Sequence, residues 1–116
     1  MSVSSAIDFK HLDKYVMGDD DLRDEVLEIF IDQLHLQLRN LDPSKDDISW
    51  KHTAHTLKGA ARGVGAWDVG DLCQEAELLV GDINNKQKAR EALLAALRDK
   101  AESAEHAARN ITGVSA

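Results

Sequence analysis

Apolar residues recur every three or four positions through most of this chain, and this spacing constrains its fold more than any other feature. It places apolar side chains along one face of an α-helix. The spacing predicts a short helix over about residues 6–17 and four longer helices over about residues 20–41, 45–64, 66–81 and 86–110. Residues that commonly end helices separate these segments, namely Gly18, Pro43, Gly63, Gly65 and Gly81.

The composition supports an all-α fold. Aromatic residues make up 4% of the 116 residues and proline occurs once, so helices are favoured and strands are not. Four substantial helices with short loops are most simply packed as an antiparallel four-helix bundle, with the short N-terminal helix capping one end. We expect one domain over residues 1–116 with a core of about 7–110. The apolar stripe expected for 20–41 is Leu22, Val26, Ile29, Phe30, Leu34, Leu38 and Leu41.

The formal net charge of −7 argues against binding to nucleic acid or to an anionic membrane, because phosphate groups attract positive surfaces. The chain has no 18-residue apolar run and no secretory signal at its start. A lone cysteine, Cys73, excludes an internal disulfide and fits a reducing cytosol. We therefore expect a cytoplasmic protein, monomeric by default and free-standing in view of its Met1 start. Residues 1–5 and 112–116 are expected to be loose.

The segment 50–66 departs from the acidity of the chain, because it holds five basic or histidine side chains and no acid. Its apolar residues, spaced 4, 3, 4 and 3, form a core face that consists of Trp50, Ala54, Leu57, Ala61 and Val64. His55 projects away from this face and shares its own face with His52, Lys58, Gly59 and Arg62. With Lys51, these side chains predict a basic patch that meets a small anionic group or an acidic partner.

The residues alone leave three interpretations of His55. It could be a solvated polar residue, a metal ligand, or a nucleophile whose neutral imidazole attacks phosphorus. In the third case, Lys58 would supply positive charge to the transferred phosphoryl oxygens. A glycine within a helix, such as Gly59, costs roughly 1 kcal/mol relative to alanine. It either gives a partner access to the imidazole or is a tolerated small residue.

The run His55-Thr-Leu-Lys58-Gly59-Ala-Ala61, followed by Gly65-Ala66, resembles the signature H-x-L-K-G-x-[AS]-x-x-x-G of histidine-containing phosphotransfer (HPt) domains. The likeness covers about residues 7–110, and its specific part is confined to 55–66. It implies a phosphocarrier of a two-component phosphorelay, which takes a phosphoryl group from a receiver-domain aspartate and passes it to another. The family has no ATP site, and this chain has no phosphate-binding loop, so the resemblance implies no enzymatic turnover of its own.

The resemblance also implies roles for individual residues. His55 would be the phosphoacceptor, Lys58 would stabilise the phosphoryl group, and Gly59 would open the site to the partner. Glu77 or Gln74 could orient one ring nitrogen of His55 and leave the other as nucleophile. The partners would be response-regulator receiver domains or a hybrid histidine kinase, and Mg²⁺ would sit on the receiver, so no cofactor is expected here. The receiver would dock on apolar surface around His55 with the cations at its edge, and Ile48 and parts of the first helix are candidates.

Two other interpretations compete with this one. A metal-binding bundle could use His52 and His55, but the E-x-x-H pattern of di-iron bundles is absent and the nearby Lys58 and Arg62 would repel a cation. A non-catalytic helical adaptor would leave His55 without a role. Outside the site, we expect three structural histidines, a core cysteine and a tryptophan that covers the bundle end, namely His11, His35, His106, Cys73 and Trp67.

Overall fold

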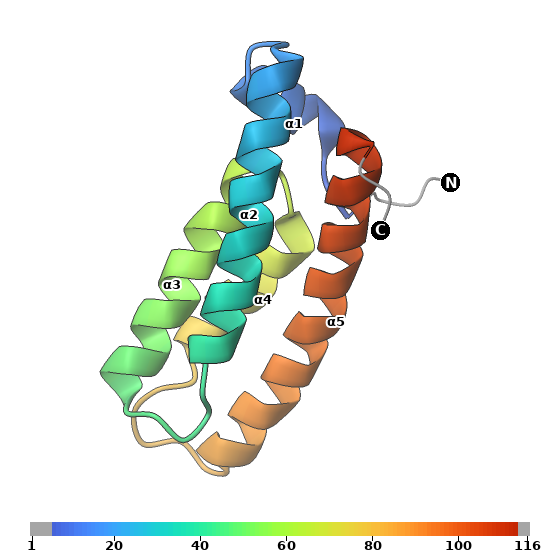
Figure 1. Cartoon of the computed structure of the whole chain (residues 1–116). Helices are drawn as coiled ribbons and strands as arrows, with labels where there is room; N and C mark the ends of the chain where they lie inside the picture. The colour runs from blue at the N-terminus through green and yellow to red at the C-terminus, as the bar shows by residue number, and fades with distance from the viewer. Residues whose placement is uncertain (1–5, 114–116) are drawn as a thin grey trace.

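The computed structural model describes residues 6–113, which form five helices and no strand within that range. They are α1 (Phe9–Tyr15), α2 (Asp20–Asn40), α3 (Asp47–Gly63), α4 (Trp67–Glu77) and α5 (Lys86–Thr112) (Figure 1). The all-α prediction is therefore confirmed. The expectations for residues 1–5 and 114–116 concern parts of the chain outside the described residues. Thr112 was expected to be loose, but it is the last helical residue of α5.

Helices α2 to α5 form the antiparallel bundle expected from the sequence. Each of α2 and α4 packs against both α3 and α5, so helices adjacent in the chain are also adjacent in space (Figure 1). The loops α2–α3 and α4–α5 lie together at one end, and α1 lies at the other end. No helix within residues 6–113 combines the length and the hydropathy needed to cross a bilayer.

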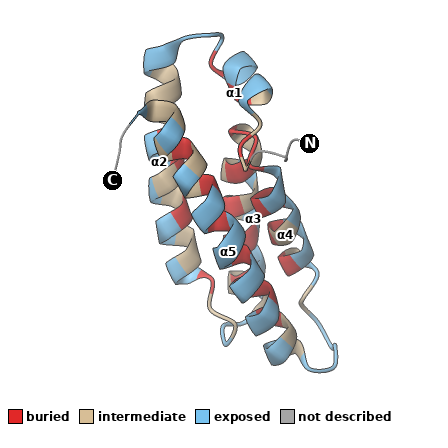
Figure 2. Ribbon diagram, turned by 90° about the vertical axis from the view of Figure 1, so that its right-hand side faces the viewer, coloured by how far each residue is buried: buried red, intermediate tan, exposed pale blue. Residues whose placement is uncertain are grey.

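The buried residues line the inward faces of the helices (Figure 2). The predicted core stripe of α3 is confirmed, since its five members are at most 3% exposed. The stripe expected for α2 is wrong in one place. Leu27 is fully buried, while Ile29 is 58% exposed. Two residues along a helix correspond to a rotation of about 200°, so the face that buries Leu27 turns Ile29 toward solvent.

Helix α4 ends at Glu77, about four residues earlier than expected. The backbone N–H groups of Leu78 and Leu79 bond to carbonyls only three residues back, those of Glu75 and Ala76. Such tighter turns commonly close a helix. Leu78 directly follows the helix and is exposed at the surface.

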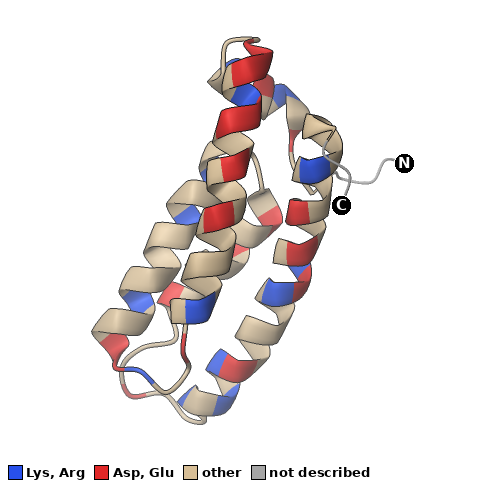
Figure 3. Ribbon diagram, viewed as in Figure 1, with Lys and Arg blue, Asp and Glu red and all other residues tan. Residues whose placement is uncertain are grey.

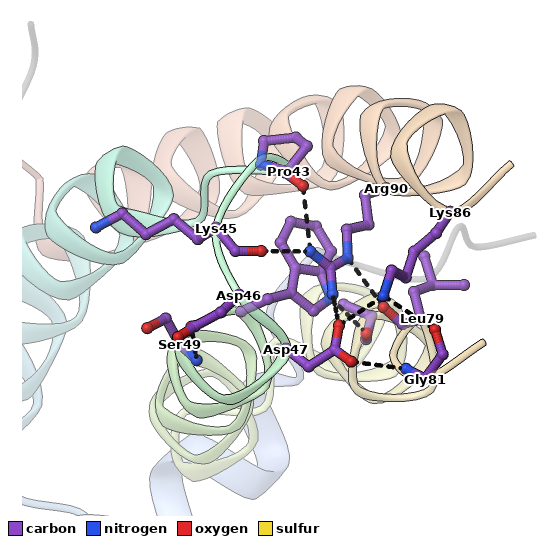
Figure 4. A network of polar contacts seen from close by, with 11 residues as sticks. Pro43, Lys45, Asp46, Asp47, Ser49, Leu79, Gly81, Lys86 and Arg90 are labelled. Carbon is purple, nitrogen blue, oxygen red and sulfur yellow. Dashed lines mark hydrogen bonds and ion pairs between the residues drawn. The ribbon is translucent and has the colours of Figure 1, made fainter. Parts of the chain in front are cut away.

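A buried arginine joins the two loops at one end of the bundle (Figure 4). Arg90 on α5 is 2% exposed. Its Nε donates to the carbonyl of Leu79 at 2.9 Å, and its Nη1 donates to the carbonyls of Pro43 at 3.1 Å and Lys45 at 2.8 Å. Its Nη2 lies 2.6 Å from Oδ1 of Asp47, the first residue of α3. One guanidinium thus connects both loops to α3.

Asp47 adds further bonds to the same end of the bundle. Its Oδ2 accepts from the backbone N–H of Gly81 at 2.9 Å, and its Oδ1 accepts from Lys86 Nζ at 2.9 Å (Figure 4). The Gly81 hydrogen bond, then the Lys86 ammonium and Arg90, hold the pKa of Asp47 below its ordinary value. The sequence predicted neither Arg90 nor Asp47 as a structural residue.

Candidate functional site

His55 lies in the middle of α3, on the side away from the core. Its side chain is 69% exposed, whereas Ala54 and Leu57 beside it in the sequence are fully buried. Helix α3 begins where the side chain of Asp46 accepts from the backbone N–H of Ser49 at 2.8 Å. The apolar spacing of α3 then determines which residues face inward, so His55 is left on the surface.

Gly65 ends α3 in a way that only glycine accommodates. Its φ of +82° is left-handed, and the N–H of Ala66 bonds back to the carbonyl of Ala61 at 2.8 Å, as in a Schellman motif. The Gly65 carbonyl accepts from the N–H of Asp8 at 2.9 Å, and an added Cβ would come within 3.0 Å of the Asp8 carbonyl oxygen. The last glycine of the 55–65 run therefore closes the helix and holds the chain before α1.

The last residue of α4 brings a carboxylate to His55. Oε2 of Glu77 lies 3.4 Å from His55 Nδ1 and 2.8 Å from Lys58 Nζ. Glu77 and Lys58 are 13% and 18% exposed, so this ion pair is largely sheltered while the imidazole is not. The distance to Nδ1 is long for a hydrogen bond, which is common at such sites before a partner binds. One carboxylate oxygen of α4 is therefore close to two side chains of α3.

The charge state of Glu77 follows from opposing effects. Burial alone would raise the pKa of Glu77, but the Lys58 ammonium and, less strongly, the His55 ring outweigh it and hold this pKa below its ordinary value. Glu77 is therefore ionised near neutral pH. An ionised carboxylate only accepts hydrogen bonds, so it favours the imidazole tautomer whose proton is on Nδ1. Nε2 is then the nitrogen with a free electron pair.

Gln74, the alternative partner for the ring, is engaged elsewhere. Its Oε1 accepts from Arg62 Nη2 at 2.8 Å, and the same guanidinium nitrogen lies 3.7 Å from Asp71. Arg62 reaches α4 by crossing Gly70, where an added Cβ would come within 2.9 Å of Arg62 Cγ. The structure thus places Arg62 and Gln74 in an α3–α4 contact, and Glu77 beside His55.

Gly59 and Gly63 continue the His55 face toward the end of α3. A Cβ added at Gly59 would meet no atom within 4 Å, so the packing of the bundle does not require glycine there. A Cβ at Gly63 would come 3.7 Å from the hydroxyl oxygen of Tyr15, the last residue of α1. Neither glycine therefore places a side chain on the part of α3 that lies between His55 and Tyr15.

Exposed apolar and basic side chains surround this face. Ile48, two turns before His55, is 82% exposed, which settles that it lies on the surface and not in the core. Leu78, next to Glu77, is 72% exposed and was not among the residues predicted for this surface. Lys51 and His52 are also exposed. Figure 3 marks basic residues along α3 and acidic residues along α2, so the charge is unevenly distributed.

The remaining histidines and Trp67 lie away from this site, whereas Cys73 is in the core, one turn before Glu77 on α4. His35 Nε2 pairs with Glu105 Oε1 at 2.7 Å, and the His11 ring packs edge-on to Trp67 with 4.8 Å between ring centroids. Trp67 covers the bundle end as expected, and His106 is exposed. Cys73 is fully buried, and burial raises the pKa of its thiol to about 12, which suits a core residue. Among residues 6–113, no three His, Cys, Asp or Glu side chains are grouped so that they could hold a metal ion.

These features define a class of protein: a small helical bundle that presents one histidine on the surface beside a sheltered lysine–glutamate pair. Comparison with known proteins agrees. Residues 25–107 match the family described as the Hpt domain. The crystal structure of the histidine phosphotransferase ShpA from Caulobacter crescentus is 40% identical in sequence, and the match covers 91% of this chain and 97% of that one with a TM-score of 0.59. A search of curated proteins found no match.

The chain belongs to the Hpt domain family. It is a phosphocarrier of a two-component phosphorelay, and its partners are phosphorelay proteins such as receiver domains and kinases. The adaptor and metal-binding alternatives are not favoured.

Proposed function

We propose that His55 is the phosphoacceptor, and that it carries the phosphoryl group on Nε2 between the aspartates of two receiver domains. The observation that supports this most is the position of Glu77, whose carboxylate oxygen lies 3.4 Å from Nδ1 of a ring that is otherwise exposed. One ring nitrogen faces a fixed negative charge, and the other is left for a partner. His35 on α2 also faces a carboxylate, since its Nε2 lies 2.7 Å from Oε1 of Glu105, but it lies outside the run His55 to Gly65 that resembles the family signature.

The proposed transfer is an in-line displacement at phosphorus. The Nε2 electron pair attacks the phosphorus of the receiver's aspartyl phosphate, the N–P bond forms, and the P–O bond to the aspartate breaks and leaves a carboxylate. The imidazole becomes positively charged as the N–P bond forms. Glu77 stabilises that charge through Nδ1–H. The reverse sequence delivers the phosphoryl group to the next receiver.

Lys58 is proposed to stabilise the phosphoryl group. It lies one turn from His55 on the same helix, and its ammonium is held in place by Glu77 at 2.8 Å. An ammonium with three donors can bond to Glu77 and to a phosphoryl oxygen at the same time. Glu77 therefore serves both side chains, because it orients the ring and keeps Lys58 close to it.

The proposal also covers the setting in which the protein acts and the surface on which the receiver docks. The protein acts as an intermediate without turnover of its own, and Mg²⁺ enters the reaction on the receiver domain. It works as a cytoplasmic monomer, with no nucleic acid or membrane as partner. The receiver docks over His55 and Gly59, with Ile48 and Leu78 as apolar contacts. Lys51 and Arg62 are nearby cations, and His52 lies beside them. The net charge of −7 and its local exception on α3 support this assignment.

A transfer assay tests the proposal. A phosphorylated receiver domain is mixed with the full chain, and a second, unphosphorylated receiver is then added. We expect the label to move to this chain and then to the second receiver. The bound label should be stable in base and labile in acid, and NMR should locate it on Nε2 of His55. A label on another residue, or on Nδ1, would contradict the proposed site.

Gly59 offers a test of docking that leaves the chemistry intact. Gly59→Ala should raise the free energy of unfolding by about 0.5–1 kcal/mol, because alanine favours helix and its Cβ meets no atom here. Gly59→Gln should also fold, but its side chain would stand between the receiver and the imidazole and block transfer. Ala95→Gln, at an exposed position of α5, is the matched control and should transfer normally. Normal transfer by Gly59→Gln would refute the access role.

A further inference from the structure

The position of Glu77 depends on a side chain that the proposed chemistry does not use. Trp50 on α3 is fully buried, and its indole Nε1 donates to the backbone carbonyl of Ala76 at 2.7 Å. Ala76 directly precedes Glu77. The hydrogen bond therefore crosses from the core face of α3 to the last turn of α4, at the residue before the carboxylate.

The end of α4 is a position where a carboxylate needs such support. Glu77 lies at the negative end of the helix dipole, which disfavours a negative charge, and it is largely buried. Both effects favour a conformation in which the carboxylate turns out to solvent. A glutamate side chain also has several rotatable bonds, so its position depends on where its own backbone is held. The Trp50 bond fixes that backbone against α3.

The indole itself is held from a second direction. The Arg90 guanidinium lies over the Trp50 ring with 4.7 Å between Cζ and the ring centroid. Arg90 also donates to the carbonyl of Leu79, which follows Glu77 by two residues. The Ala76 carbonyl accepts a second bond, from the N–H of Leu79 at 3.0 Å. The backbone is thus held on both sides of Glu77.

We propose that Trp50 is a positioning residue for the phosphoacceptor: its indole N–H holds the end of α4 so that the Glu77 carboxylate stays beside His55 Nδ1 and Lys58. This inference rests on the proposed role of His55. It assigns to a core tryptophan an effect on the tautomer and reactivity of a histidine that it does not touch.

The chain contains a matched control at the other end of the same helix. Trp67 begins α4, and its indole Nε1 donates to Oδ2 of Asp8 at 3.0 Å. Trp67→Phe removes the indole donor at the start of α4. Trp50→Phe removes the indole donor of α3 that bonds to the last turn of α4. If Trp50 had only a structural role, both changes would affect the melting temperature and neither would affect His55.

The experiment uses the full chain in three forms: wild type, Trp50→Phe and Trp67→Phe. NMR of ¹⁵N-labelled histidine reports the tautomer of neutral His55, and phosphoramidate, a small phosphoryl donor, reports the labelling rate without a protein partner. In the wild type and in Trp67→Phe we expect the proton on Nδ1. In Trp50→Phe we expect a mixture of tautomers and a labelling rate lower by about 3- to 10-fold, as for a reacting group that loses its fixed geometry. An unchanged tautomer and rate in Trp50→Phe would overturn the inference.

A second comparison shows whether Trp50 acts through Glu77. In a Glu77→Gln background, adding Trp50→Phe should change neither the tautomer nor the rate further, because effects that pass through one residue are not additive. A further loss equal to that in the wild-type background would also overturn the inference. If Trp50→Phe does not fold in buffer, all forms are measured with trimethylamine N-oxide, which favours the folded state. A wild type without the Nδ1 proton, or labelled elsewhere, would instead contradict the proposed site itself.

Discussion

Replacing His55 with glutamine is expected to abolish labelling by a phosphorylated receiver domain. The amide nitrogen of glutamine has no electron pair available for attack on phosphorus, so no N–P bond can form. The side chain is 69% exposed and contributes nothing to the core. The free energy of unfolding should therefore stay within about 0.5 kcal/mol of the wild type. Labelling and urea unfolding, measured on the same preparation, separate loss of the nucleophile from loss of the fold.

His52→Gln is the matched control for this change. His52 lies one turn earlier on the same helix and is also exposed, and within residues 6–113 it forms no ion pair with a carboxylate, unlike His55. With phosphoramidate, which needs no docking surface, it should label at the wild-type rate. Lys58→Ala should still label on His55, but its phosphohistidine should hydrolyse faster because the ammonium no longer stabilises the phosphoryl oxygens. Labelling of His55→Gln would remove His55 from the proposal, and an unchanged phosphohistidine lifetime in Lys58→Ala would remove Lys58.

Replacing Arg90 with methionine is expected to cause the largest loss of stability. Methionine keeps much of the aliphatic length but removes every donor of the guanidinium. The carbonyls of Pro43, Lys45 and Leu79 lose their bonds to it, and Asp47 loses one cation. Leaving a buried acceptor without its donor typically costs about 1–3 kcal/mol. Three carbonyls lose a bond here, whereas Asp47 is 40% exposed and keeps Lys86. Urea unfolding at pH 7 should show a loss of this size.

Arg98→Met, at an exposed position two turns further along α5, is the control, and its free energy of unfolding should stay within about 0.5 kcal/mol of the wild type.

The contribution of Asp47 to stability depends on pH. Hydrogen bonds from Gly81 and Lys86 hold the pKa of Asp47 below its ordinary value, so its stabilising effect is present at neutral pH. That effect is lost as the pH falls through the lowered pKa. Equal stability of the Arg90 and Arg98 variants at pH 7 would refute the structural role assigned to Arg90.

Local patterns were enough to predict most of the fold. The apolar spacing of α3 placed five residues in the core correctly, because helical geometry alone determines which residues share a face. Gly18, Pro43 and Gly65 located helix ends to within a few residues, because glycine and proline end helices through their own backbone preferences. The error at Ile29 arose where several apolar residues cluster within one turn of α2. In such a turn, the neighbouring helices decide which of them is buried.

Local sequence patterns predicted only part of the candidate site. The run from His55 to Gly65 is continuous in sequence, so its spacing predicted the exposed histidine, the nearby lysine and the uncrowded glycine face. The family resemblance suggested Glu77 to orient the ring, with Gln74 as a competitor. They lie on another helix, and the packing angle between α3 and α4 determines which of them comes near His55.

The sequence by itself determined the helices, their inward faces and the face of α3 that carries His55, since each depends on residues within a few turns of one another. Only the tertiary structure decided that Glu77 meets His55 and Lys58, that Arg62 pairs with Gln74, and that Arg90 holds both loops. These contacts join residues 11 to 47 positions apart. No local periodicity relates side chains at such separations, and only the packed bundle brings them within bonding distance.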